Sequence, residues 1–461
     1  MNRVRQRVAV RLLSSATHHP SSPASGSGSG SGLGCRYGSA AAVGGAANMQ
    51  MERAQSLLEQ SVAFQLSLSS EPKPRAGKRV RVAVGVSGGV DSSVSAFLLK
   101  SMGYDVTGVF MRNWDATDER GESVCSYTRD RADAKAVCAQ LGIPFEEVDF
   151  VKDYWNLVFE EFITDLENGL TPNPDILCNS QIKFKRFADY CISKFGVDFV
   201  STGHYAQLRP SAWGAREVLL YRAADMNKDQ SYFLCDVDQR ALQKTLFPVG
   251  CFSSKQHVKD LAQMLHFPFV AEKKESMGIC FVGKRPFSEF IRPYLRTTVP
   301  GNVVDIDSNK ILESHENASA FTLGQRAGVG GAKDRVFVVK KQDATGTIFV
   351  GVGRNHPALF TNSLVAARFH WISSLRPERE VAEYQVRYRQ PPGTCSIVLH
   401  DPNSQAPTVT AMFDKPQRAA TRGQWLALYS PDGVCYGGGK ITAVGPSLHD
   451  LGQSSPADYF L

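Results

Sequence analysis

One short segment, Ser-Gly-Gly-Val-Asp-Ser-Ser at positions 87–93, constrains most strongly how this chain can fold. The valine-rich stretch 79–86 before it predicts a strand, and apolar residues at helical spacing over 92–103 predict a helix after it. Gly88 and Gly89 allow the backbone to approach a ligand closely, and the amide groups that begin the helix favour an anion. The segment therefore predicts a strand, loop and helix that together bind phosphate.

Strand and helix patterns keep alternating beyond this loop. Strands are predicted at 105–111, 144–149 and 197–202, and helices at 129–141 and 181–195. Such alternation is typical of an α/β fold, in which helices cover both faces of a parallel sheet. We expect this domain to span residues 78–283.

The pattern changes after Gly283. Repeated glycines punctuate short apolar stretches, which predicts a small strand-rich central domain at 284–360. Turn residues then separate short predicted strands at 382–389, 395–399, 408–413, 424–429 and 434–444. Their spacing indicates a compact all-β barrel or sandwich, and we expect a C-terminal β-barrel at 361–450.

The first part of the chain has a different composition. No acidic residue precedes Glu52, whereas arginines are spread among serines and small apolar residues. This composition is typical of an organelle transit peptide, and a disordered tail is the alternative. We therefore exclude residues 1–70 from the fold as a transit peptide and disordered linker. No apolar run in the chain reaches the roughly 18–20 residues that a membrane helix needs, so we expect a soluble protein.

The ten cysteines include no Cys-x-x-Cys pair, so neither a zinc ribbon nor a thioredoxin-type motif is predicted. Cys178 follows Thr-Pro-Asn-Pro-Asp at 171–175, whose two prolines predict a rigid loop that leads into a helix. The helix dipole would favour the thiolate of Cys178, as a nucleophile requires, and Asp175 could move a proton or hold a base edge. A structural loop with a buried cysteine is the alternative. Cys280, flanked by apolar residues and glycines, on its own indicates a core strand.

The phosphate loop is not of the Walker type, because no Gly-Lys-Ser/Thr follows it. It resembles the PP-loop of ATP pyrophosphatases, which split ATP between the α and β phosphates and adenylate a substrate oxygen. Asp91 would lie near the pyrophosphate and hold magnesium or a serine. Because synthetases, ligases and tRNA thiolases share this loop, it does not select the substrate.

Further motifs occur in the order found in one PP-loop family, from about Lys78 to Val444. The chain resembles the tRNA-specific 2-thiouridylases, in their mitochondrial branch. The matching segments are Phe-Met-Arg-Asn-Trp (110–114), Thr-Pro-Asn-Pro-Asp-Ile-Leu-Cys-Asn (171–179), Thr-Gly-His-Tyr-Ala (202–206), Lys-Asp-Gln-Ser-Tyr-Phe-Leu (228–234), Gly-Ile-Cys-Phe-Val-Gly (278–283), Phe-Thr-Leu-Gly-Gln-Arg (321–326), Val-Gly-Arg-Asn-His-Pro (352–357) and Arg-Tyr-Arg-Gln (387–390).

The resemblance implies ATP-dependent 2-thiolation of the wobble uridine of tRNA. Cys178 and Cys280 would be the nucleophile and the persulfide carrier, with Asp175 beside them. ATP would contact Gly85, Val86, Ser87, Gly88, Gly89, Val90, Asp91, Ser92, Met111 and Gly203. Asn173, Pro174 and Asp175 would surround the target base, and tRNA would touch His204, Lys228, Asp229, Gln230, Arg387, Tyr388 and Gln424. The remaining cysteines within the matching region are interpreted as structural.

The resemblance also implies partners and a location. ATP would come with Mg²⁺, and the sulfur would come from a donor or relay protein downstream of a cysteine desulfurase. The transit peptide would direct the chain to the mitochondrial matrix, with a plastid as the alternative. No membrane contact is expected.

Three other hypotheses remain open on the sequence. One is a PP-loop amidotransferase or ligase that uses ammonia and needs no cysteine pair. Another is a tRNA-binding protein that keeps ATP as a structural ligand. The third is a cluster-dependent thiolase, with iron and sulfur held by Cys178, Cys280 and a third ligand; the sequence specifies no metal ligands.

Overall fold

The computed structural model describes residues 79–115, 127–212, 217–267, 281–282, 286–296, 299–330, 334–402, 404 and 407–456. The predicted transit peptide at 1–70 and the predicted persulfide carrier Cys280 lie outside these residues. Within the described part of the chain, no helix has the length and apolar character needed to cross a membrane.

A five-stranded parallel sheet forms the N-terminal domain, as the alternating pattern predicted. Its strands are β1 (Arg81–Gly85), β2 (Asp105–Arg112), β3 (Phe145–Asp149), β4 (Phe199–Ser201) and β7 (Thr245–Leu246), in the order β3-β2-β1-β4-β7. Each neighbouring pair is parallel. The central strand β1 is buried from its second residue onward, as expected for a strand covered on both faces.

Helices cover both faces of this sheet because successive side chains of a strand point to opposite sides. Val82 and Val84 pack in one cluster with α3 (Val90–Ser101), α5 (Tyr127–Leu141) and α11 (Lys255–Met264). Ala83 belongs to a second cluster on the other face. The helices of that cluster include α6 (Val151–Tyr154), η2 (Trp155–Phe159), α7 (Glu160–Glu167), η3 (Cys178–Arg186), α9 (Phe187–Phe195) and α13 (Phe287–Ile291).

The central domain is a separate five-stranded sheet. It consists of β8 (Gly301–Asp305), β9 (Ile311–His315), β10 (Arg326–Ala327), β11 (Val336–Gln342) and β12 (Thr347–Val352), in the order β10-β11-β12-β8-β9. The buried valines and isoleucine of β8, β11 and β12 form its core. Although α13 falls within the range predicted for this domain, its Phe290 and Ile291 pack on the N-terminal core.

Six C-terminal strands close a barrel, in agreement with the predicted architecture. They are β13 (Phe360–Trp371), β14 (Val381–Gln385), β15 (Gly393–His400), β16 (Thr408–Arg418), β17 (Trp425–Tyr429) and β18 (Val434–Val444). The ring closes because β13 pairs with both β16 and β18. The sequence reading missed β13, whose register shifts at several points and whose Arg368 has φ 51°.

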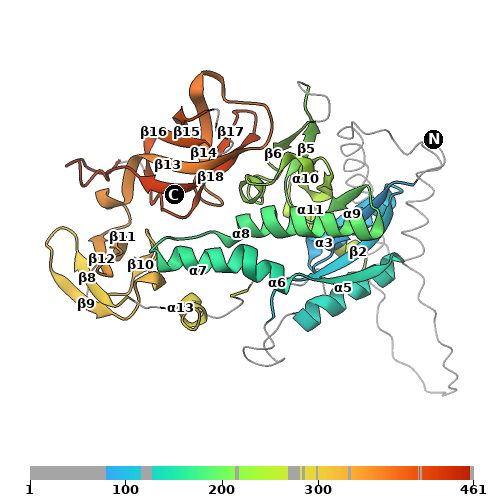
Figure 1. Cartoon of the computed structure of the whole chain (residues 1–461), viewed down its shortest axis with the longest axis horizontal. Helices are drawn as coiled ribbons and strands as arrows, with labels where there is room; N and C mark the ends of the chain where they lie inside the picture. The colour runs from blue at the N-terminus through green and yellow to red at the C-terminus, as the bar shows by residue number, and fades with distance from the viewer. Residues whose placement is uncertain are drawn as a thin grey trace, which may run out of the picture.

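A hairpin from the N-terminal domain continues the barrel sheet. Its strands are β5 (Gln207–Pro210) and β6 (Val218–Tyr221), and β6 pairs antiparallel with β18. The sequence analysis did not predict that a hairpin of the N-terminal domain pairs with the barrel. Figure 1 shows the parallel sheet and the central sheet at opposite ends of the molecule, with α7 and α8 (Pro174–Leu177) running between them and the barrel alongside. The short helices are η4 (Ser231–Leu234), α10 (Gln239–Leu242), η5 (Pro248–Cys251), η6 (Ala318–Ala320), η7 (Pro357–Leu359) and η8 (Glu378–Glu380).

Candidate active site

The phosphate loop lies between the end of β1 and the start of α3. Gly88 has φ 71°, and a Cβ on it would lie 2.2 Å from the backbone oxygen of Asp130, so a larger residue would displace the chain. The amide of Ser87 donates to Oγ of Ser92 at 3.1 Å, and the two hydroxyls lie 3.2 Å apart. Gly89 caps α3 with extended backbone and no side chain, so the first amides of the helix face the loop. This geometry suits an anion.

Asp91 connects the loop to two distant elements. The hydroxyl of Tyr205 donates to its Oδ1 at 2.8 Å, and the ammonium of Lys255 pairs with the same oxygen. The backbone amide of Lys255, at the start of α11, donates to Asp225 at 2.8 Å. Lys255 therefore brings a positive charge to the phosphate loop. No sequence pattern indicated Lys255, and Tyr205 was part of a matching motif without an assigned role.

The other predicted ATP residues border this loop. A Cβ on Gly203 would lie 2.6 Å from the backbone nitrogen of Ser92, so only glycine lets the two segments pack this closely. A Cβ on Gly85 would lie 3.0 Å from the terminal methyl of Met111. Gly85 and Met111 occupy the carboxyl ends of neighbouring parallel strands, where open α/β sheets bind their ligands.

The turn at 228–230 packs against Tyr205, which contacts Asp91 of the phosphate loop. The amide of Tyr205 donates to Oε1 of Gln230 at 2.9 Å, and the amide of Gln230 donates to the carbonyl of Tyr205 at 2.8 Å. Asp229 is buried and accepts hydrogen bonds from Ala223 and Ser231. Its carboxylate thus stabilises the turn, and Gln230 positions Tyr205; Lys228 is half-buried. Their contacts with tRNA stay a prediction.

The cysteine segment enters its helix earlier than predicted, so Asp175 and Cys178 lie in the helix rather than on the loop before it. Pro174 is the first residue of α8, and the nine-residue π-helix η3 follows directly from Cys178. π-helical segments are frequent at functional sites. The Cys178 side chain is 4% exposed, and its amide already bonds to carbonyls of the preceding turn. The thiol therefore lies one turn into the helix, beyond the free amides where the dipole acts most strongly.

Phe281, the residue after Cys280 in the sequence, lies in the same core cluster as Cys178. Its ring centroid is 5.3 Å from that of Trp114, the last residue of the motif at 110–114. The cluster therefore contains Cys178 itself and the residue that follows Cys280 in the sequence. The pairing of Cys178 with Cys280 itself stays a prediction.

Two titratable groups near this segment have shifted pKa values. Burial raises the pKa of the Asp175 carboxyl, and the positive charge of Lys183 opposes the shift. Burial, reinforced by Lys183, holds the pKa of His204 well below its usual value, so this imidazole is neutral at pH 7. The Nδ1 atom of His204 lies 2.7 Å from the Thr202 hydroxyl. A carboxyl whose pKa is raised by burial holds its proton more readily than an exposed one, which suits a general acid or base.

The barrel holds the loop predicted to surround the target base. Nε2 of Gln424 donates to the carbonyl of Thr171 at 2.8 Å, and Nδ2 of Asn173 donates to Oε1 of Gln424 at 3.4 Å. The amide of Thr171 also donates to the carbonyl of Arg422 at 2.9 Å. Gln424 was predicted to touch tRNA; in this structure its side chain positions the loop at 171–173.

Arg387 and Tyr388 lie on the barrel side of the same region. The Tyr388 ring centroid is 4.6 Å from that of Phe233, whose carbonyl accepts a hydrogen bond from Asn179 at 3.1 Å. Nη1 of Arg387 donates to the carbonyl of Arg418 at 3.2 Å. The structure thus places Tyr388 one aromatic ring away from the helix that begins with Cys178.

Comparison with known proteins follows the same division of the chain. Residues 80–284 match the tRNA methyl transferase HUP domain, 288–352 the tRNA methyl transferase PRC-barrel domain, and 361–441 the aminomethyltransferase beta-barrel domain. Over 397 residues the chain is 43% identical to the mitochondrial tRNA-specific 2-thiouridylase 1 of Danio rerio, covering 80% of this chain and 93% of that protein. The human protein of the same name is 41% identical over 396 residues, covering 80% and 92%.

A bacterial relative gives similar values. The tRNA-specific 2-thiouridylase MnmA of Francisella tularensis subsp. holarctica is 44% identical over 368 residues, covering 78% of this chain and 99% of that protein. Among solved structures, the U34-tRNA thiolase NcsA of Methanococcus maripaludis with its [4Fe-4S] cluster aligns at a TM-score of 0.32 and 21% identity, covering 50% of this chain and 70% of that chain. A structural likeness at this level carries no functional argument.

Proposed function

Because the chain belongs to the tRNA-specific 2-thiouridylase family, we propose that it uses ATP to replace the 2-oxygen of a tRNA wobble uridine with sulfur. The main support is that one family match, over 80–284, spans both the phosphate loop and the two-cysteine region. The amides that begin α3 would receive the phosphates, and Lys255, which pairs with Asp91, brings a positive charge beside them. The wobble base would leave its stack to enter the site, as bases do in enzymes that modify them.

The chemistry that we propose proceeds in three steps. The uracil 2-oxygen attacks the α-phosphorus of ATP and pyrophosphate leaves, so the oxygen becomes part of an AMP leaving group. The terminal sulfur of a persulfide on Cys280 attacks C2, and AMP departs with the oxygen. The Cys178 thiolate then attacks Sγ of Cys280 and breaks the bond to the transferred sulfur, which stays on the base. The sulfur gains the two electrons that the cysteines lose, and a thiol reductant resets their disulfide.

Residues around the cysteines would support these steps. A Cys178–Cys280 disulfide needs Cα atoms within about 7 Å, and the shared cluster of Cys178 and Phe281 favours such proximity. Asp175, with its raised pKa, would hold or accept the uracil proton. The persulfide sulfur would come from a donor or relay protein downstream of a cysteine desulfurase.

Magnesium fits this site as a companion of ATP. Oδ1 of Asp91 accepts from Tyr205 and pairs with Lys255, so the second oxygen of this carboxylate would hold Mg²⁺. Mg²⁺ is usually held by one or two carboxylates together with phosphate oxygens. No group of three protein ligands for a metal occurs among the described residues. The ion would neutralise charge on the leaving pyrophosphate.

The test of this function is mass spectrometry of tRNA nucleosides after incubation with ATP and a persulfide donor, with pyrophosphate measured in parallel. We expect 2-thiouridine and pyrophosphate to form together. Pyrophosphate with an ammonia-derived product would indicate an amidotransferase or ligase, and tRNA binding without pyrophosphate would indicate a non-enzymatic role. An iron assay and an anaerobic absorbance spectrum test the cluster-dependent variant.

Replacement of Asp91 by asparagine should lower the rate of pyrophosphate release by about 100-fold, because the side chain would no longer hold Mg²⁺ or orient Lys255, and loss of one such electrostatic group costs this order of magnitude. Asparagine keeps an oxygen for the Tyr205 hydroxyl but removes the charge that pairs with Lys255. Tyr205→Phe is the matched control, because it removes only the hydrogen bond and should cost about tenfold or less. Equal rates for Asp91→Asn and the wild type would contradict the role of Asp91.

We also propose that the chain acts in the mitochondrial matrix. Its arginine-rich, acid-free start and two relatives with mitochondrial names support this location. Fusion of residues 1–70 to a fluorescent protein tests it, and a reporter that enters plastids or stays in the cytosol would contradict it.

A further inference from the structure

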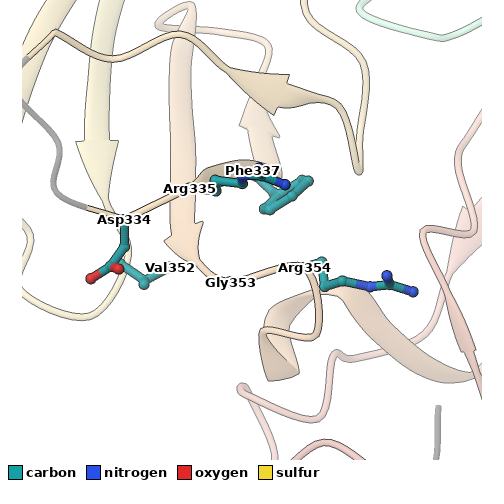
Figure 2. A pocket seen from close by; sticks show the side chains of 6 residues that line it. All are labelled: Asp334, Arg335, Phe337, Val352, Gly353 and Arg354. Carbon is teal, nitrogen blue, oxygen red and sulfur yellow. The ribbon is translucent and has the colours of Figure 1, made fainter. Parts of the chain in front are cut away.

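A pocket far from the phosphate loop in the fold opens on the central domain, between the start of β11 and the end of β12. Asp334, Arg335, Phe337, Val352, Gly353 and Arg354 line it. Figure 2 shows the guanidinium groups of Arg335 and Arg354 on the same side as the Phe337 ring, whereas the carboxylate of Asp334 points the other way. Neither arginine belongs to the residues that the family motifs assigned to ATP or tRNA.

Four arginines surround Phe337. Arg335 precedes it by two positions, and Arg326 is its direct partner across β10 and β11, so its side chain shares the face of Phe337. The guanidinium of Arg418, on the barrel, lies 5.9 Å from the centroid of the Phe337 ring. With Arg354, these side chains form what we call the arginine pocket.

Three of the arginines in the arginine pocket lie at the surface. Arg326, Arg335 and Arg354 are exposed, and within the part of the chain described here none of them pairs with a carboxylate. Asp334 is the one carboxylate among the residues that line the pocket, against Arg335 and Arg354, so positive charge is in excess there, and such an excess attracts polyanions. Guanidinium groups bind phosphate in bidentate fashion, and a half-buried phenyl ring offers a stacking surface for a base or ribose.

Hydrogen bonds connect the arginine pocket to a predicted tRNA contact. Nε of Arg418 donates to the carbonyl of Arg354 at 2.8 Å, and Nη1 of Arg387 donates to the carbonyl of Arg418 at 3.2 Å. Arg387 adjoins Tyr388, whose ring lies against Phe233. The carbonyl of Phe233 accepts a hydrogen bond from Asn179 of η3, the helix that begins with Cys178. Arg418 is 8% exposed, so it links the exposed Arg354 to Arg387 structurally rather than presenting its own charge at the surface.

We propose that the arginine pocket binds the sugar-phosphate backbone of tRNA at a point away from the target uridine. This inference rests on the proposed function for the identity of the RNA. It assigns the central domain a role in holding the body of the tRNA while the anticodon region occupies the active site. The ligand would be a phosphate diester of the tRNA backbone. The experiment therefore compares binding of tRNA with binding of free inorganic phosphate.

The experiment measures tRNA binding, without ATP, for the wild type and for Arg335→Ala/Arg354→Ala over a range of salt concentrations. We expect the Kd at moderate salt to rise about tenfold and the slope of log affinity against log salt to fall by about 1 to 2, one unit or slightly less per lost phosphate contact. Under turnover the KM for tRNA should rise while kcat stays unchanged, because both arginines are exposed and distant from the chemistry.

Two control variants keep the proposal falsifiable. Lys310→Ala/Lys415→Ala removes the same net charge from exposed positions outside the arginine pocket and should leave the Kd within about twofold, since single surface charges act weakly when they make no contact. Arg335→Lys/Arg354→Lys should recover part of the affinity, because lysine keeps the charge but not the bidentate geometry.

Three outcomes would overturn the proposal. The first is an unchanged tRNA affinity of Arg335→Ala/Arg354→Ala, and the second is an equal loss of tRNA affinity in Lys310→Ala/Lys415→Ala. The third is loss of inorganic phosphate binding by Arg335→Ala/Arg354→Ala with its tRNA affinity retained, which would identify a small-anion site. If the wild-type protein binds tRNA but does not thiolate it, the proposed function is rejected. The proposal that the arginine pocket binds RNA is unaffected by that result.

Discussion

Replacement of Cys178 by serine should abolish 2-thiouridine, with a loss of at least about 1,000-fold, as for removal of a catalytic nucleophile. Serine retains the shape of the side chain but cannot form a disulfide with Cys280 or release the persulfide sulfur. Adenylation of the base needs no thiol, so pyrophosphate release in a single turnover should stay within about threefold of the wild-type rate. Mass spectrometry of nucleosides and a pyrophosphate assay on the same reaction separate the two steps.

Cys191 provides a matched control in the same core cluster. It is fully buried on α9, and burial raises the pKa of its thiol to about 12, which disfavours the thiolate that a nucleophile needs. Cys191→Ser should therefore keep 2-thiouridine formation. Equal loss in both variants would mean that buried serine damages the core, whereas thiolation by Cys178→Ser would exclude the two-cysteine mechanism.

The parts of the site that depend on local sequence could be predicted. The phosphate loop needs glycines at 88 and 89 between a strand and a helix, and these residues lie within a few positions of one another. The prolines at 172 and 174 similarly fix the start of α8. In both cases the backbone restriction acts within one or two turns, so the pattern in the sequence already contains the structural cause.

The contacts that depend on the tertiary fold could not be predicted. Lys255 pairs with Asp91 across 164 positions of the sequence, and β6 joins the barrel through two residue pairs with β18. Nothing in the local composition of either segment marks these partners, because a lysine at a helix start or a short apolar strand fits many folds. The strand β13 was not predicted for a related reason. Its register shifts interrupt the alternation of buried and exposed residues on which strand prediction depends.

Arg222 makes further long-range contacts, where the N-terminal hairpin joins the barrel. The residue follows β6 and is 6% exposed. Its guanidinium lies 3.6 Å from the Tyr429 ring centroid, 3.7 Å from the Asp229 carboxylate and 3.6 Å from the Glu383 carboxylate. None of its side-chain nitrogens has a hydrogen bond among the described residues. Charge and the aromatic ring therefore hold this buried cation in place.

Replacement of Arg222 by methionine should lower the free energy of unfolding by about 3–5 kcal/mol, because it leaves Asp229 as a buried carboxylate without its cationic partner. Urea unfolding measures this loss. Arg209→Met is the matched control: Arg209 lies on β5 of the same hairpin, is exposed and stacks on Tyr221 at 4.2 Å, so its replacement should cost only about 0.5–1 kcal/mol.

The pH dependence distinguishes lost charge from lost packing. Burial raises the pKa of Asp229, hydrogen bonds from Ala223 and Ser231 oppose this shift, and the positive charge of Arg222 opposes it further. Without Arg222 the folded-state pKa rises further above the unfolded value, so folding takes up a proton and stability falls as pH rises through that range. The deficit of Arg222→Met should therefore be largest at neutral pH and shrink as pH falls toward the unfolded pKa of about 3.9. A deficit that is constant with pH would mean that the arginine acts through packing alone.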